Sequence, residues 1–140
     1  MKKINITPEA AERIAEWAVK EAKEALAETQ SEAGCAETEA EYAADRLAEQ
    51  DYDGAGDGAD QAERAAELAA YHAQEAWQAA KHAAEASNQA GTKRAANLAK
   101  VAIDLAEEAK REAERAERAA DSTLPGWIAS EAHRAWRTAA

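Results

Sequence analysis

The residues of this chain whose types could do chemistry are mostly carboxylates, and they are crowded into one stretch. Between Glu21 and Asp60 the chain carries thirteen acids against only Lys23 and Arg46, and the resulting charge of −11 equals the formal net charge of all 140 residues. Carboxylates gathered in this way attract cations, either a metal ion or the Lys and Arg side chains of another protein. The chemistry to expect is therefore electrostatic binding.

The spacing of these acids predicts that they form rows on helices. Acids that recur at steps of three and four residues lie about 5–6 Å apart on one helix face. Like charges at that spacing destabilise a helix by about 0.2–0.5 kcal/mol per pair. Because so few bases lie nearby to offset this cost, the rows favour a binding role. Two such rows are predicted, the first made of Glu21, Glu24, Glu28 and Glu32, the second of Glu37, Glu41, Asp45 and Glu49.

A segment rich in aspartate and glycine follows the second row. Residues 51–60 read DYDGAGDGAD, and three glycines in so short a stretch predict a long acidic loop. A loop of this composition could wrap Ca²⁺ with oxygen ligands, but Ala55 and Ala62 stand where an EF-hand loop needs acids. We interpret it as an acidic linker and keep calcium binding as an alternative. Its four acids complete the predicted partner-binding set, namely Asp51, Asp53, Asp57 and Asp60.

No arrangement of other reactive residues predicts catalysis. The three histidines lack the spacing of metal sites, and the chain has neither a Gly-rich phosphate loop nor a nucleophile elbow. We expect His72, beside the Ala face of its helix, to be an interior or half-buried residue whose ring is hydrogen-bonded. Cys35 is the single cysteine, which excludes an intrachain disulfide, and we expect it to be buried or half-buried. No apolar run approaches the roughly 20 residues of a membrane span. We predict a cytoplasmic protein that is not an enzyme and has no cofactor.

The elements that must position the acids are predicted to be helices. Ala occupies 43 positions by direct count, Phe is absent and only two prolines occur. Thr7 and Pro8 start a helix that reaches about Ala33, Gly34 stops it, and a second helix ends near Gln50. One long helix over 8–50 with a kink at Gly34 is the alternative. Further helices are predicted over 61–90, with a face made almost purely of Ala, over about 92–120 and over 126–139.

These elements predict one all-α domain spanning 1–140. It is a bundle of about five helices, with a helical hairpin over 61–121 whose two long antiparallel Ala-rich helices form its centre. We expect its four tryptophans to fill gaps between diverging helices, with one of Trp127 and Trp136 left exposed.

The predicted function is binding to a basic protein surface, one that itself holds nucleic acid, as an inhibitor imitating nucleic acid would do. Direct binding to nucleic acid or to a membrane is not expected. The alternative is an assembly module that self-associates through its Ala faces and an exposed Trp.

Overall fold

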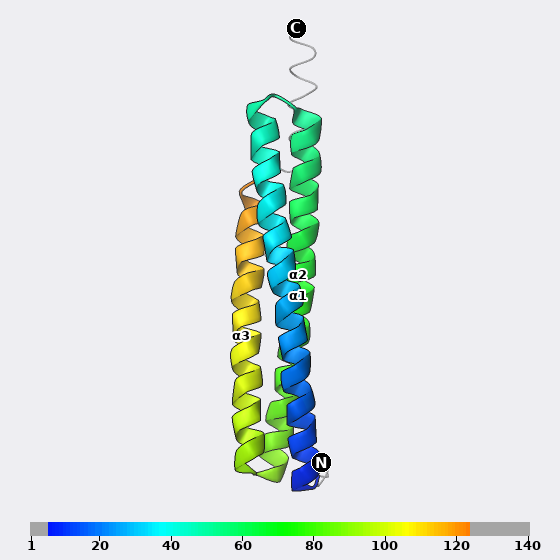
Figure 1. The fold of residues 1–140 in the computed structure, drawn as a ribbon, viewed down its shortest axis with the longest axis vertical. Coiled ribbons are helices and arrows are strands. Elements are labelled where there is room, and N and C mark those ends of the chain that lie inside the picture. Colours follow the sequence, from blue (N-terminus) through cyan, green and yellow to red (C-terminus); the bar gives the residue numbers. More distant parts are fainter. Residues whose placement is uncertain (1–5, 124–140) are drawn as a thin grey trace. The chain divides into compact units, whose positions relative to one another are not determined.

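The computed structural model describes residues 6–123, and within this range the chain is all-α. It forms α1 (Pro8–Ala48), α2 (Tyr52–Ala90) and α3 (Lys93–Asp121), joined by two short connections (Figure 1). Four of the five expected helices fall within this range and three are observed, because the predicted break at Gly34 is absent. The helix predicted over 126–139, with Trp127 and Trp136, lies outside the described residues.

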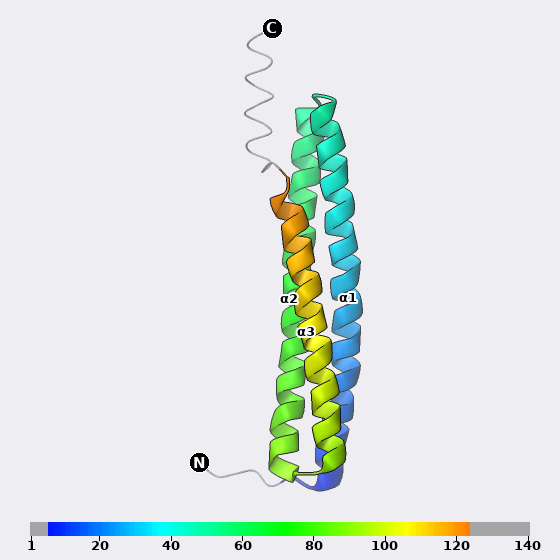
Figure 2. The ribbon, with the colours of Figure 1, turned by 90° about the vertical axis from the view of Figure 1, so that its left-hand side faces the viewer.

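The helix starts follow the predicted local chemistry. The backbone N–H of Ala10 donates to Thr7 Oγ1 at 3.1 Å, so Thr7 caps α1 and Pro8 takes its first position. Thr92 caps α3 in the same way, accepting from the N–H of Ala95 at 3.1 Å. Gly91 ends α2 with a φ of 64°, a left-handed conformation that glycine adopts without steric cost. The turn between α2 and α3 was predicted correctly (Figure 2).

The predicted break at Gly34 is wrong, and the alternative of one long helix is confirmed. α1 continues through Gly34 and ends at Ala48. A helical glycine costs only about 1 kcal/mol relative to Ala, which good helix formers on both sides offset. The chain leaves the helix through Gln50, a left-handed residue whose φ is 62°. There the N–H of Asp51 donates to Arg46 O at 2.8 Å and the N–H of Gln50 to Leu47 O at 3.0 Å, the two bonds of a Schellman motif.

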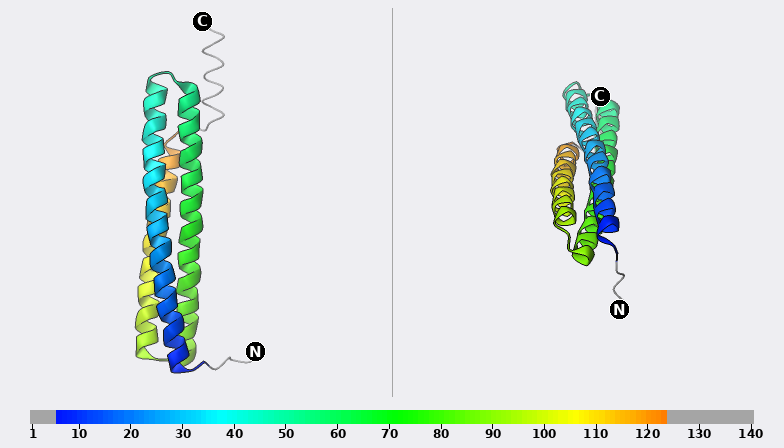
Figure 3. Two further views of the ribbon diagram at one scale, coloured as in Figure 1. Left: turned by 45° about the vertical axis from the view of Figure 1, so that its right-hand side comes forward. Right: turned by 60° about the horizontal axis from the view of Figure 1, so that its bottom comes forward.

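The predicted acidic loop over 51–60 is also wrong, because α2 already begins at Tyr52 (Figure 3). Asp51 caps it, accepting from the N–H of Gly54 at 3.0 Å. In this segment Gly58 does not form a turn; it allows two helices to pack closely. A Cβ added to Gly58 would lie 3.0 Å from the Cβ of Ala43 and 3.1 Å from its Cα. The missing side chain therefore lets α2 approach α1 closely.

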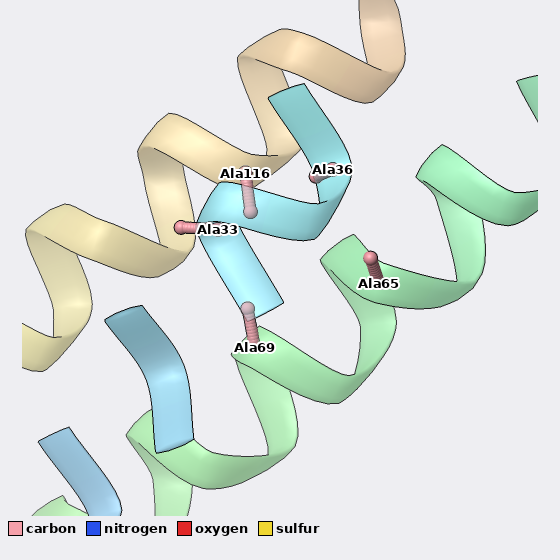
Figure 4. Close-up of a cluster of buried hydrophobic side chains, with 5 residues drawn as sticks. All are labelled: Ala33, Ala36, Ala65, Ala69 and Ala116. Atoms are coloured by element: carbon pink, nitrogen blue, oxygen red, sulfur yellow. The ribbon is translucent and has the colours of Figure 1, made fainter. Parts of the chain in front are cut away.

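The chain divides into two compact units, and all three helices contribute to both. Unit 1 comprises residues up to Gln30 together with Ala70–Arg111, and unit 2 comprises Ser31–Ala69 with the residues from Glu112 onward. In unit 1, the three helices meet in a buried cluster to which each contributes one alanine: Ala11 of α1, Ala86 of α2 and Ala95 of α3. In unit 2, a corresponding cluster joins α1, α2 and α3 (Figure 4), and its buried members are Ala33, Ala36, Ala65, Ala69 and Ala116.

The core of both units is made almost entirely of alanine, and most large apolar side chains lie outside it. Among residues 6–123, the buried apolar side chains are all Ala except Val19 and Leu26. The predicted Ala face of residues 62–84 is confirmed, with only Ala66 and Ala84 half-buried. The two tryptophans among residues 6–123 do not fill gaps as expected, since Trp17 is 48% exposed and Trp77 is 38% exposed. Small side chains allow close helix approach, which leaves less interior space for large ones.

Candidate acidic interface

The predicted partner-binding acids fall into two groups that belong to different units. Glu21, Glu24 and Glu28 lie in unit 1, on the first part of α1. The other nine lie in unit 2 on α1, on the connection and on the start of α2. We call these nine the acidic surface: Glu32, Glu37, Glu41, Asp45, Glu49, Asp51, Asp53, Asp57 and Asp60.

The negative charge of the protein resides almost entirely in unit 2. Its described residues, 31–69 and 112–123, contain sixteen acids and four Lys or Arg, a charge of −12. The described residues of unit 1, 6–30 and 70–111, contain eleven acids and nine Lys or Arg, a charge of −2. Unit 2 therefore concentrates a charge that the sequence distributes over two separate stretches.

Arginines neutralise part of the acidic surface. Arg115 of α3 contacts Glu37, and its hydrogen bond to that carboxylate raises the pKa of the guanidinium above its ordinary value, so this partner stays charged. Arg46 pairs with Glu49 at 3.2 Å and lies 3.9 Å from an oxygen of Asp51. All these pairs are solvent-exposed, where an ion pair contributes only about 0–1 kcal/mol. They reduce the local charge without removing it.

Five carboxylates of the acidic surface have no cationic partner among residues 6–123. Glu41, Asp45, Asp57 and Asp60 are exposed, and Glu32 is half-buried. Glu41 and Asp45 are four residues apart on α1, and Asp57 and Asp60 are three apart on α2, so each pair shares a helix face. The segment predicted as a flexible loop instead holds its acids on a rigid helix. This arrangement keeps the carboxylates of each pair close enough for their potentials to add.

The three acids of unit 1 line a hollow of about 380 Å³ between α1 and α2. Glu75 of α2 faces it as well, as does Trp17. His72 is half-buried as predicted, its Nδ1 lying 2.8 Å from Glu75 and its Nε2 3.8 Å from Glu28. This imidazole links carboxylates that come from two helices.

Sequence reasoning missed Glu75 and Arg115 as members of these arrangements. Both lie outside the acidic stretch, in segments whose charges alternate in sign like those of an ordinary solvent-exposed helix face. No local pattern distinguishes the one arginine of α3 that reaches Glu37 from its neighbours, because that contact joins residues 78 positions apart.

The loop on which the calcium alternative rested is largely helical in the structure. Among the residues that it describes, no group of three or more His, Cys, Asp or Glu is arranged to hold a metal ion. Apart from Asp51, the glycines and aspartates that were to wrap the ion are in α2, so they do not form a loop that could surround it. Cys35 is exposed, contrary to the expectation of burial.

Within residues 6–123, no helix is both long enough and apolar enough to cross a bilayer.

The chain was compared with protein-family models, with curated proteins and with solved structures, and none of the three comparisons finds a match.

Proposed function

We propose that the protein binds a basic surface of another protein through the acidic surface of unit 2, and that it competes there with nucleic acid. The observation that carries this proposal is the charge of −12 over the described residues of unit 2, presented on helices with five carboxylates unpaired. Rows of carboxylates on a rigid scaffold resemble a phosphate backbone in charge, and they attract the Lys and Arg side chains that hold such a backbone.

The proposal is binding without catalysis. The carboxylates of the acidic surface are exposed or half-buried, so none is enclosed in a dry pocket of the kind that prepares a carboxyl group for proton transfer. The single cysteine remains the reason to place the interaction in a reducing compartment such as the cytoplasm.

The test compares two variants that change the net charge equally. In the first, Glu41, Asp45, Asp57 and Asp60 are all changed to Lys, which reverses the four exposed members of the five unpaired carboxylates of the acidic surface. In the second, Glu9, Asp104, Glu107 and Glu108 of unit 1 are changed to Lys. All eight positions are exposed, and circular dichroism checks that both variants remain helical.

Each immobilised protein is exposed to host lysate at low salt, and bound proteins are eluted with rising salt. We expect the wild type and the unit 1 variant to capture the same basic protein. Both should release it steeply between about 0.1 and 1 M salt, because the Debye length falls to a few ångströms. Duplex DNA should displace it. Capture by the unit 2 variant at wild-type level, or a captured protein that duplex DNA does not displace, would contradict the proposal.

Self-association, the alternative function, cannot use the Ala faces, because the helices of the chain bury them against one another. A different observation, confined to unit 1, favours it.

A further inference from the structure

Unit 1 exposes large apolar side chains on two separate surfaces. Trp17 is 48% exposed, Ile14 is 36% exposed and Val101 of α3 is 43% exposed. In a helix of a globular protein, such side chains usually face the core and polar side chains face water. Here the core positions belong to Ala, so this apolar area is available for contact with another molecule.

The first surface is a groove between α1 and α2. It consists of two adjoining hollows, of about 330 and 380 Å³, which share Trp17 and His82. One end is apolar and contains Ile14, and the other end contains Glu21 and Glu24. The rings of Trp17 and His82 lie 6.1 Å apart and are tilted by 56°, so they form the wall where the two ends meet. The groove therefore fits a helix that is apolar at one end and basic at the other.

The second surface is a strip at the start of α3. Lys93, Arg94, Leu98 and Val101 line one hollow of about 510 Å³. The sequence contains no acid between Glu85 and Asp104. Lys93 and Arg94 stand at the positive end of the α3 dipole, where cations destabilise the helix. We call this surface the basic strip.

The groove and the basic strip match in spacing when their helices run antiparallel. Along α1, two apolar residues and an acid follow at steps of three and four: Ile14, Trp17 and Glu21. Along α3, read backwards, two apolar residues and a base follow at the same steps: Val101, Leu98 and Arg94. At 1.5 Å per residue, both sets span about 10 Å.

The charges are also complementary. Arg94 already donates to Glu16 of its own chain, whereas Lys93 and Lys100 make no ion pair within residues 6–123. In the antiparallel register, Lys93 lies at the acidic end of the groove beside Glu21 and Glu24. Lys100 then lies at the apolar end, where Glu85 lines the groove.

We propose that the groove of one copy of this chain binds the basic strip of a second copy, with α3 of the second copy antiparallel to α1 of the first. The contact buries Ile14 and Trp17 against Leu98 and Val101, and it pairs the free lysines with groove carboxylates. It uses residues of unit 1 only, so it is independent of the function proposed for unit 2.

The test is the association state of full-length variants, measured by sedimentation velocity over a range of concentrations. The groove variant carries Glu21→Lys and Glu24→Lys, and the strip variant carries Lys93→Glu and Lys100→Glu. Two controls make the same charge changes elsewhere: Asp57→Lys with Asp60→Lys, and Lys110→Glu with Arg111→Glu. Every changed side chain is exposed except Glu21, which is half-buried, and circular dichroism confirms that each variant is folded.

We expect the wild type and both controls to self-associate with the same affinity. The groove variant and the strip variant should each dissociate, with a Kd raised at least about tenfold, because two attractions become repulsions. A mixture of the two variants should associate again. In that mixture the intact groove of the strip variant meets the intact strip of the groove variant. The reversed groove of one and the reversed strip of the other also carry opposite charges.

Three results would overturn the proposal. The first is a wild type that stays monomeric up to about 1 mM, the concentration that corresponds to a negligible binding free energy of about −4 kcal/mol. The second is equal dissociation of a control and its matched variant, which would make net charge the cause. The third is a mixture that stays monomeric. If a synthetic Lys- and Leu-rich helical peptide binds the groove of a monomeric wild type, the occupant is a foreign helix and the second copy is excluded.

Discussion

At the scale of single residues, two helical glycines, Gly34 and Gly58, have opposite effects on stability. A Cβ at Gly34 would meet nothing within 4 Å, so the glycine only weakens α1. A Cβ at Gly58 would press on Ala43, including its main chain, and a main-chain atom cannot rotate away. The same residue type is a defect in one position and a packing requirement in the other.

This difference predicts that Gly→Ala substitutions at the two positions change stability in opposite directions. Gly34→Ala should raise the free energy of unfolding by about 0.4–1 kcal/mol, because Ala has the better helix propensity and restricts the unfolded chain. Gly58→Ala gains the same term but overpacks the contact with α1, which costs about 1–3 kcal/mol, so its net effect is a loss. Chemical denaturation measures both values. A Gly58→Ala variant as stable as Gly34→Ala would show that the close approach is absent.

At the scale of the elements, the connection between α1 and α2 depends on one side chain. Asp51 is the residue that follows the left-handed Gln50, and its carboxylate caps α2 through Gly54. It also lies 3.9 Å from Arg46. The capping bond is the stronger contribution, since a cap contributes about 1 kcal/mol and an exposed ion pair about 0–1 kcal/mol.

Substitutions of Asp51 separate these two contributions. Asp51→Asn keeps a side-chain oxygen that can accept from the N–H of Gly54 but removes the charge, so stability should fall by less than about 0.5 kcal/mol. Asp51→Ala removes both and should cost about 1–2 kcal/mol. Unfolding in urea gives the two values. If Asn were as damaging as Ala, the ion pair with Arg46 rather than the cap would hold the connection.

At the scale of the whole molecule, charge and core act against each other. Each buried Ala removes little apolar area from water, so a core made of Ala contributes less than one made of Leu or Ile. Unit 2 adds self-repulsion from sixteen acids against four bases. Stability should therefore respond to anything that screens charge.

Salt is expected to raise the melting temperature. A few like-charge neighbours at about 0.2–0.5 kcal/mol each amount to about 1 kcal/mol, which corresponds to a shift of about 2–8 °C for a protein in this size range. Differential scanning calorimetry between about 0.01 and 1 M NaCl measures it. The variant with Lys at Glu41, Asp45, Asp57 and Asp60 provides the control and should respond less. A melting temperature that is flat or falls with NaCl in the wild type would argue against self-repulsion.

The features that sequence reasoning predicted correctly are those that depend on neighbours along the chain. Thr7 and Thr92 cap helices because a hydroxyl three residues before an N–H can reach it, and Gly91 ends α2 because its own backbone tolerates a positive φ. The all-α class follows in the same way from the propensities of Ala and Glu. The rows of carboxylates needed only the 3.6-residue repeat of a helix, and α1 supplies it without interruption.

The features that sequence reasoning missed depend on residues far apart in the chain. Gly58 became part of a helix because α1 lies against it, and Trp17 became exposed because alanines already filled the space between helices. Arg115 neutralises Glu37 from 78 positions away, and the division into units gathers separate acidic stretches. Capping bonds and propensities act within a few residues, whereas close packing and charge pairing act between whichever surfaces the folded chain brings together, and local pattern does not contain that information.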